Sequence, residues 1–208
     1  MARTRSGLRS RAGPAMKQLH LWPNQIVVPF EYLVGNLTIL KLYFRFLKLA
    51  DADVPFPVLV ARPSRSHRDF IRDRSVLPVE TEAFFSTIDA LVADRDAYYL
   101  IDGNHRGLAA TLCRRPLHAL EVESDADLDE LESMVERGDY IDLPSFPLDS
   151  YDHGWLPTRI GALVTELEER HQGWEILTLD ERTERLADEG QLPEYMIAHY
   201  RSKRRAAP

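Results

Sequence analysis

The stretch from residue 98 to residue 113 constrains the fold more than any other part of the chain. It reads Tyr-Tyr-Leu-Ile-Asp-Gly-Asn-His-Arg-Gly-Leu-Ala-Ala-Thr-Leu-Cys. The first four side chains are apolar or aromatic and predict a short buried strand, which Asp102 and Gly103 break into a tight turn. Residues 107–113 have the composition of a buried helix whose small alanines permit close packing. A strand, a glycine turn and a helix are therefore expected in direct succession.

A helix that starts just after a glycine turn is suited to binding an anion. Its first amide groups lack intrahelical partners, and the macrodipole places partial positive charge there. Gly103 lets the backbone approach a ligand closely, and the guanidinium of Arg106 suits bidentate contact with a phosphate. His105 lies where that ligand would sit. The chemistry of these residues alone predicts a phosphate-binding turn.

The same residues also resemble a known family. Residues 101–106, followed by Leu-Ala-Ala at 108–110, look like the Asp-Gly-x-His-Arg signature of the ParB/sulfiredoxin superfamily. The resemblance extends to three further segments and covers roughly residues 20–124 with an apparent insertion at 62–95; the segments are 26–33, 57–60 and 117–122. Members bind a nucleotide through this turn. Some are CTP-dependent partition switches, and others are ATP-using enzymes that include kinases of free serine.

Departures from the family narrow what the resemblance implies. Sulfiredoxins carry a cysteine where this chain has Asn104, so repair of sulfinic acids is not supported. Partition proteins have a Gly-Glu-Arg-Arg turn, which this chain lacks. The enzyme branches with Asp-Gly-His-His-Arg are the most similar. The resemblance therefore implies an α+β fold with a small mixed sheet, a C-terminal helical extension, and ATP or another nucleotide with Mg²⁺ as cofactor.

On this basis each residue of the turn has an expected role. The backbone of Gly103 and Asn104 and the guanidinium of Arg106 would hold the β- and γ-phosphates. His105 would contact a phosphoryl oxygen or transfer a proton, and Asp102 would orient the turn or hold Mg²⁺. The structural alternatives are that Asp102 only caps the turn and that His105 is a buried imidazole with satisfied hydrogen bonds.

A further catalytic residue is implied outside the turn. Glu31 resembles, by its position after the first strand, the acidic residue that serine-kinase relatives use as a general base. An exposed surface acid is the equal alternative. The leading function is a phosphotransferase or nucleotide hydrolase acting on a small hydroxyl compound. The runner-up is a non-catalytic nucleotide sensor that regulates DNA or a protein partner, and a nuclease lacks a supporting carboxylate cluster.

Periodicity predicts the elements around the motif. A strand is expected over 18–30, followed by a helix over 36–50 that Asn36 caps and that is buried on most sides, with a polar edge of Lys41, Arg45 and Lys48. Further elements are a strand at 58–61, a helix at 81–94, a strand at 117–122, and helices from Ser124 and over 157–172, 180–189 and 193–204. The predicted organisation is a basic tail (1–17), a nucleotide-binding domain (18–124) and a mainly helical extension (125–208).

Charge is distributed unevenly along the chain. All 33 acidic residues lie between residues 18 and 200. Nine of the 26 basic residues lie at the two ends, as Arg3, Arg5, Arg9, Arg11, Lys17, Arg201, Lys203, Arg204 and Arg205. An acidic body repels a phosphate backbone, so DNA contact is expected only through these tails. The first 15 residues lack the apolar segment of a secretory signal, and a translation start at Met16 is the simplest expectation, with an organelle-targeting peptide as the alternative.

The remaining observations concern compartment, membrane and metal. Cys113 is the only cysteine, which excludes a disulfide framework, favours a small buried hydrophobe over a reactive thiol, and predicts a reducing, cytoplasmic location. Residues 32–50 are mostly apolar, but three central cations argue against a membrane span, so no membrane partner is expected. The histidines form no zinc-binding pattern, and the acids between 121 and 139 favour a solvated helix face over a metal site.

Overall fold

The computed structural model describes residues 16–28, 36–49, 57–62, 78–124, 126–140 and 176–206. Glu31, the arginine-rich residues from 63 to 74 and the helix expected over 157–172 lie outside these ranges. The described residues form a mixed α+β structure around one six-stranded sheet.

The sheet is mixed, as the family resemblance implied. Its strands are β1 (Lys17–Leu21), β2 (Ile26–Val28), β3 (Val58–Ala61), β4 (Tyr98–Asp102), β5 (Leu117–Glu121) and β6 (Leu177–Thr178), in the spatial order β1-β5-β3-β4-β2-β6. The pairs β5–β3 and β4–β2 are parallel, whereas β1–β5, β3–β4 and β2–β6 are antiparallel. The motif strand β4 thus lies inside the sheet, between β3 and β2, and both of its edges are hydrogen-bonded.

Helices cover both faces of the sheet. The first face carries α1 (Leu37–Leu49), α4 (Asn104–Leu112), α7 (Leu179–Asp188) and α8 (Glu194–Ala206), and the second carries α3 (Pro78–Arg95) and α5 (Ala126–Arg137). Successive residues of β4 alternate between the two cores: Tyr98 and Leu100 belong to the first, Tyr99 and Ile101 to the second. A strand buried on both faces reads as a continuous apolar run, which is the pattern at 98–101.

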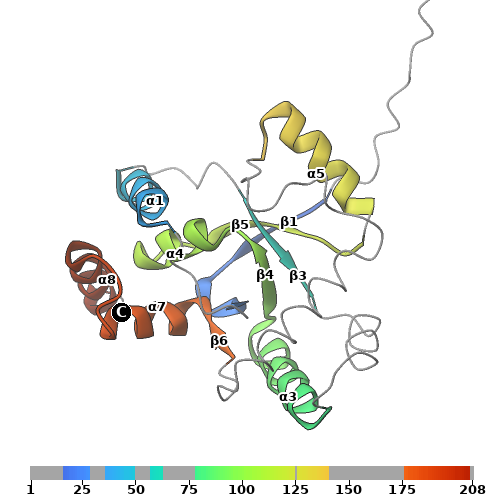
Figure 1. Ribbon diagram of the computed structural model, residues 1–208, viewed down its shortest axis with the longest axis horizontal. Helices are drawn as coiled ribbons and strands as arrows, with labels where there is room; N and C mark the ends of the chain where they lie inside the picture. The colour runs from blue at the N-terminus through green and yellow to red at the C-terminus, as the bar shows by residue number, and fades with distance from the viewer. Residues whose placement is uncertain are drawn as a thin grey trace, which may run out of the picture.

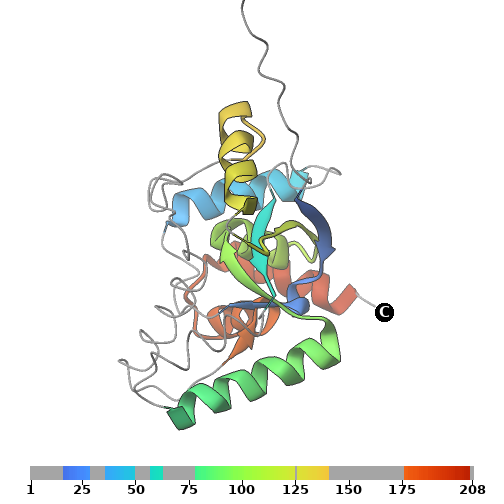
Figure 2. The ribbon, with the colours of Figure 1, turned by 90° about the vertical axis from the view of Figure 1, so that its right-hand side faces the viewer.

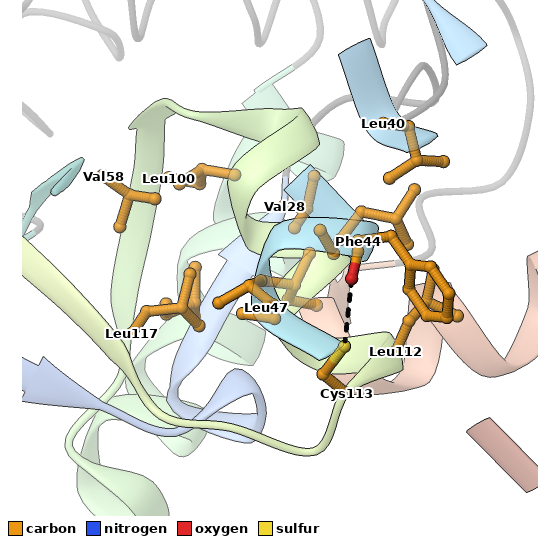
Figure 3. Packing of buried hydrophobic residues seen from close by; sticks show 14 of the residues in the cluster. Val28, Leu40, Phe44, Leu47, Val58, Leu100, Leu112, Cys113 and Leu117 are labelled. Atoms are coloured by element: carbon orange, nitrogen blue, oxygen red, sulfur yellow. Dashed lines mark hydrogen bonds between the residues drawn. The ribbon is translucent and has the colours of Figure 1, made fainter. Parts of the chain in front are cut away.

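Helices α1 and α4 pack side by side and run parallel. The backbone amide of Asn36 meets His105 at one end, and the Cys113 thiol donates to the carbonyl of Phe44 over 3.9 Å at the other. Both pairs are separated by 69 residues in sequence, so the two helices lie in register. Figure 3 shows Leu40, Phe44 and Leu47 of α1 facing this core. Because the helices are parallel, both N-termini lie at the same end of the pair.

Two expectations from the sequence need correction. The single strand expected over 18–30 is interrupted: β1 ends at Leu21, and a 3₁₀ turn, η1 (Pro23–Gln25), precedes β2. Pro23 fixes the backbone and lacks the amide that a continuing ladder needs, so it starts the turn. The helix expected to be buried on most sides, α1, buries only one stripe, and large apolar side chains on its outer face are exposed.

The C-terminal residues join the same core as the motif. Strand β6 pairs with β2, and the apolar faces of α7 and α8 contribute Leu179, Leu186, Met196 and Tyr200 to the first core. Figures 1 and 2 show these red elements beside α1 and α4. None of the helices in the described ranges has the length and apolar character that crossing a membrane requires.

Candidate functional site

The motif forms a one-residue turn between a strand and a helix. Strand β4 ends at Asp102, and Gly103 takes a left-handed backbone conformation (φ 104°) as the N-cap of α4. A Cβ atom at this position would lie 2.6 Å from Cγ1 of Val58 on β3, so the position requires glycine for space as well as for conformation. The helix starts at Asn104, three residues earlier than the small-residue pattern predicted, and His105 and Arg106 therefore lie in its first turn.

Arg106 is buried, and its hydrogen bonds join the two sides of the turn. Its Nη2 donates to the Asp102 carboxylate over 2.6 Å and to the Tyr140 hydroxyl over 3.1 Å. The Tyr140 hydroxyl in turn donates to the same carboxylate oxygen. The guanidinium also lies over the Tyr140 ring, 5.0 Å from its centre. These three residues link the end of β4, the first turn of α4 and the residues that follow α5.

One nitrogen of the Arg106 guanidinium has no hydrogen-bond partner among the described residues. The Arg106 side chain is only 3% exposed, yet Nη1 is buried without a hydrogen-bond partner. Burial lowers the pKa of Arg106, but the nearby Tyr140 and Asp102 outweigh burial and raise that pKa above its ordinary value, so the group stays charged. A buried donor without a partner costs free energy, and a bound anion is one way to satisfy it.

His105 joins the N-termini of the two parallel helices. Its Nε2 accepts the backbone N–H of Asn36 over 2.9 Å. Asn36 caps α1, because its side-chain oxygen accepts the amides of Thr38 and Ile39. Burial lowers the pKa of His105, and Arg106 adds to this effect while Asp102 opposes it. The imidazole is therefore neutral at pH 7, and its other nitrogen, Nδ1, carries the proton.

Two helix N-termini thus meet at one place. Each end carries partial positive charge from its macrodipole, and the two contributions add because the helices are parallel. The charge of Arg106 lies in the same turn, partly neutralised by Asp102. Such an arrangement favours a group with more than one negative charge, such as a phosphoryl group.

The structure brings together five of the predicted site residues, from Asp102 to Arg106. Gly103, Asn104, His105 and Arg106 form the junction between β4 and α4, whereas Glu31 lies outside the described residues. The geometry disfavours a metal role for Asp102, because its Oδ2 already accepts from two donors and a guanidinium lies beside it. Within the described ranges, no three His, Cys, Asp or Glu side chains gather closely enough to hold a metal ion.

The sequence did not predict two of the contacts at this site. Tyr140 lies 34 residues after Arg106, in no recognisable motif, and it reaches the turn only because α5 folds back over the sheet. Asn36 was predicted as a helix cap, but its contact with His105 depends on the parallel packing of α1 on α4. Neither contact has a local sequence signal.

A surface hollow in the described part of the chain lies away from this turn. It measures about 520 Å³ and is lined by Trp22, Pro23, Asn24, Gln25, Asp94, Arg95, Arg114 and Asp180. Arg114 follows the C-terminal end of α4, so the hollow is separated from Gly103 by the length of that helix, about 14 Å. Two Arg and two Asp side chains balance its charge, which gives it no preference for an anion.

The chain was compared with family models, curated proteins and solved structures. No family model, curated protein or solved structure matches its sequence or fold.

Proposed function

We propose that the protein binds a nucleotide through its phosphates at the paired N-termini of α1 and α4, and that it acts as an ATP- or ADP-dependent phosphotransferase or nucleotide hydrolase on a small hydroxyl compound. One observation carries this proposal: two parallel helices start side by side, next to a buried guanidinium with an unused donor. The ParB/sulfiredoxin-like fold and the cytoplasmic location belong to the same proposal, and they rest on the motif and the single cysteine.

The roles follow from the contacts at the turn. The free amide N–H groups of the first turn of α4 would donate hydrogen bonds to the terminal phosphate, and the macrodipole of α1 would add to their effect. Nη1 of Arg106 would donate to a phosphoryl oxygen while Nη2 keeps Asp102 in place. Nδ1 of His105 would donate to a second oxygen, because Nε2 is occupied by the Asn36 amide. Catalysis would come from positioning and from neutralising charge around the transferring group.

Mg²⁺ would reach the site bound to the nucleotide. Asp102 is engaged by Arg106 and Tyr140, so the described residues do not offer a set of carboxylates for the ion. The phosphates themselves would be its main ligands. Nucleotide affinity is therefore expected to depend less on Asp102 as a metal ligand than on Asp102 as the partner that holds Arg106.

The proposal is tested by titrating the full chain with ATP, ADP and tripolyphosphate, with and without Mg²⁺, and following the unfolding midpoint. A ligand that binds only the native state raises this midpoint. Arg106→Lys keeps the charge but loses the planar fork, and we expect it to weaken nucleotide binding at least tenfold. Arg114→Lys is the matched control, because Arg114 also pairs with an aspartate but lies at the other end of α4. Equal affinities in wild type and Arg106→Lys would contradict the proposed site.

A specific observation favours the non-catalytic alternative. Nε2 of His105 and the carboxylate of Asp102 are both occupied by hydrogen bonds within the protein. A catalytic acid or base needs a free position near its substrate, so these bonds would suit a nucleotide sensor better than an enzyme. Measuring phosphate release at saturating ATP separates the two. Turnover that His105→Gln abolishes supports the enzyme, and tight binding without turnover supports the sensor.

A further inference from the structure

Four cations on α1 and α8 lack an acidic partner among the residues that the structure describes. Nearly every basic side chain that the structure describes has a partner, as in the pairs Arg137–Glu130 and Arg201–Asp188. The exceptions, which no ion pair joins to a described acid, are Lys41, Arg45, Lys48 and Lys203. All four are exposed, and α1 carries no acidic residue. Unpaired positive charge therefore gathers on two helices of a chain whose net charge is −7.

The two helices bring these cations onto one surface. The ring of His199 on α8 packs against Phe44 on α1, with the ring centres 5.3 Å apart. Burial lowers the pKa of His199, and the positive charges of Lys48 on α1 and Lys203 on α8 lower it further, so this ring senses a cation from each helix. The basic edge of α1 thus continues onto α8. Figure 1 shows the two helices as neighbours at the left-hand edge of the view.

Large apolar side chains protrude beside the basic edge. Leu42, Phe46 and Leu49 are spaced at i, i+4 and i+7, and they are 68%, 44% and 76% exposed. At 100° per residue they form a stripe on the side of α1 opposite the buried Leu40, Phe44 and Leu47. Large apolar side chains gathered on one exposed helix face are typical of a surface that contacts another molecule or a membrane.

We propose that the outer face of α1, with Lys203 of α8, docks on the surface of a membrane that contains anionic phospholipids. Lys41, Arg45, Lys48 and Lys203 contact the headgroups, and Leu42, Phe46 and Leu49 enter the boundary between headgroups and acyl chains. A basic amphipathic helix that lies in the plane of the interface has this combination of side chains. The helix lies on the membrane and does not span it. This proposal departs from the sequence-based expectation that the protein has no membrane partner.

Shape and charge favour a lipid surface over other occupants. The stripe lies on a convex helix, and a convex ridge inserts into a fluid layer without needing a complementary groove. A second copy packed antiparallel on this stripe would bring the three cations of α1 against the same three cations, which repel one another. Nucleic acid matches the cations, but of the three apolar side chains only Phe46 offers a ring on which a base could stack, and Leu42 and Leu49 offer none.

The test measures binding of the full chain to vesicles by co-sedimentation at low and high salt. Vesicles of phosphatidylcholine with 30% phosphatidylserine are compared with vesicles of phosphatidylcholine alone. One variant combines Lys41→Gln, Arg45→Gln and Lys48→Gln, and a second combines Leu42→Gln and Leu49→Gln. Their matched controls are Arg95→Gln, Arg137→Gln and Arg185→Gln together, and Trp22→Gln, an exposed aromatic away from α1. The basic N-terminal residues are the same in every protein, so the differences report on α1.

We expect wild type to bind only the anionic vesicles and to be released at high salt. Removing the three cations lowers the partition coefficient about 100-fold, because each surface cation contributes roughly fivefold. Removing the two leucines lowers it about tenfold at low salt, and each control changes it less than about threefold.

Three results would overturn the proposal. One is that wild type does not bind the anionic vesicles, and another is that the leucine variant binds them as well as wild type does. The third is that the control charges matter as much as those of α1. If instead Leu42→Gln with Leu49→Gln converts a dimer into a monomer, the occupant is a second copy. If a 20-base-pair duplex binds through the α1 cations while vesicles do not, the occupant is nucleic acid.

Discussion

At the scale of single residues, Gly103 sets the geometry of the motif. It is the only residue between β4 and α4, and both its backbone conformation and its contact with Val58 exclude a larger side chain. Two other glycines, Gly138 and Gly190, also have positive φ values (77° and 68°), but added Cβ atoms there would meet no neighbour within 4 Å. Replacing glycine by alanine at these positions therefore distinguishes the free-energy cost of a left-handed backbone, which all three share, from the cost of a steric clash, which only Gly103 has.

Gly103→Ala is expected to lower the free energy of unfolding by about 3 kcal/mol, which combines a left-handed backbone cost with overpacking against Val58. Gly138→Ala, which carries only the backbone cost, is expected to lower it by about 1 kcal/mol. Urea denaturation of the two variants measures the difference. Equal losses would show that β3 yields to a methyl group at residue 103.

At the scale of elements, the register of α1 on α4 decides what the motif can do. The Asn36–His105 and Phe44–Cys113 contacts hold the two helices parallel and in register. Burial raises the pKa of the Cys113 thiol to about 11, so it is neutral and packs as a small apolar group, as the sequence predicted. The apolar side chains between the two contacts bury the helix interface, and the polar contact at His105 aligns its N-terminal end.

His105 makes this alignment depend on pH. Its pKa in the folded state is lowered below the ordinary value near 6.5, so between these two values the unfolded chain binds more protons. Stability therefore rises with pH through this window: the contribution is complete above about 6.5 and is lost as the pH falls through the folded pKa. Protonation also turns Nε2 into a donor, which breaks its bond with the Asn36 amide.

The free energy of unfolding of wild type is expected to fall between pH 7.5 and pH 5.5, and His105→Gln is expected to flatten this dependence. Glutamine can still accept a hydrogen bond but does not titrate in this range. The comparison is made in a His199→Gln background, because burial and nearby lysines lower the pKa of His199 as well. An unchanged slope in His105→Gln would show that this histidine does not control the pH response.

At the scale of the whole molecule, the C-terminal helices and the motif, which are far apart in sequence, share one core. Leu179 of α7 packs where a side chain at Gly107 would be, since a Cβ there would lie 2.9 Å from its Cδ2. Met196 and Tyr200 of α8 belong to the same core as Leu100 of the motif strand. The last described elements are therefore needed to cover the face of the sheet that carries the motif helix.

Two truncations are expected to differ sharply. Removing residues 176–208 takes away β6, α7 and α8, exposes the first core, and should abolish cooperative unfolding. Removing residues 1–15 should leave the unfolding midpoint and any nucleotide affinity unchanged. Differential scanning calorimetry of both truncated proteins measures whether each unfolds cooperatively and at what temperature. A cooperative transition without residues 176–208 would show that the sheet is stable without its C-terminal helices.

Much of the local structure was predictable because its signals are local. The strand at 58–61 and the helices near 81–94, 180–189 and 193–204 match the observed elements within a few residues. The glycine turn after residue 102 was also predictable, because few residues other than glycine adopt its backbone conformation. The exposure of the outer face of α1 was not predictable. Its apolar residues have the pattern of a buried helix, and only the packing of α1 on α4 shows which apolar stripe is covered.

The sequence by itself determined that a strand, a glycine and a helix follow one another at residues 98–113, and that an arginine lies at the start of that helix. Only the tertiary structure decided that α1 lies parallel to α4, that Tyr140 shares Asp102 with Arg106, and that one guanidinium nitrogen is left without a partner. The physical reason is range. Backbone conformation and burial periodicity act over a few residues, whereas helix packing and buried hydrogen bonds join residues that the sequence separates by 34 to 69 positions.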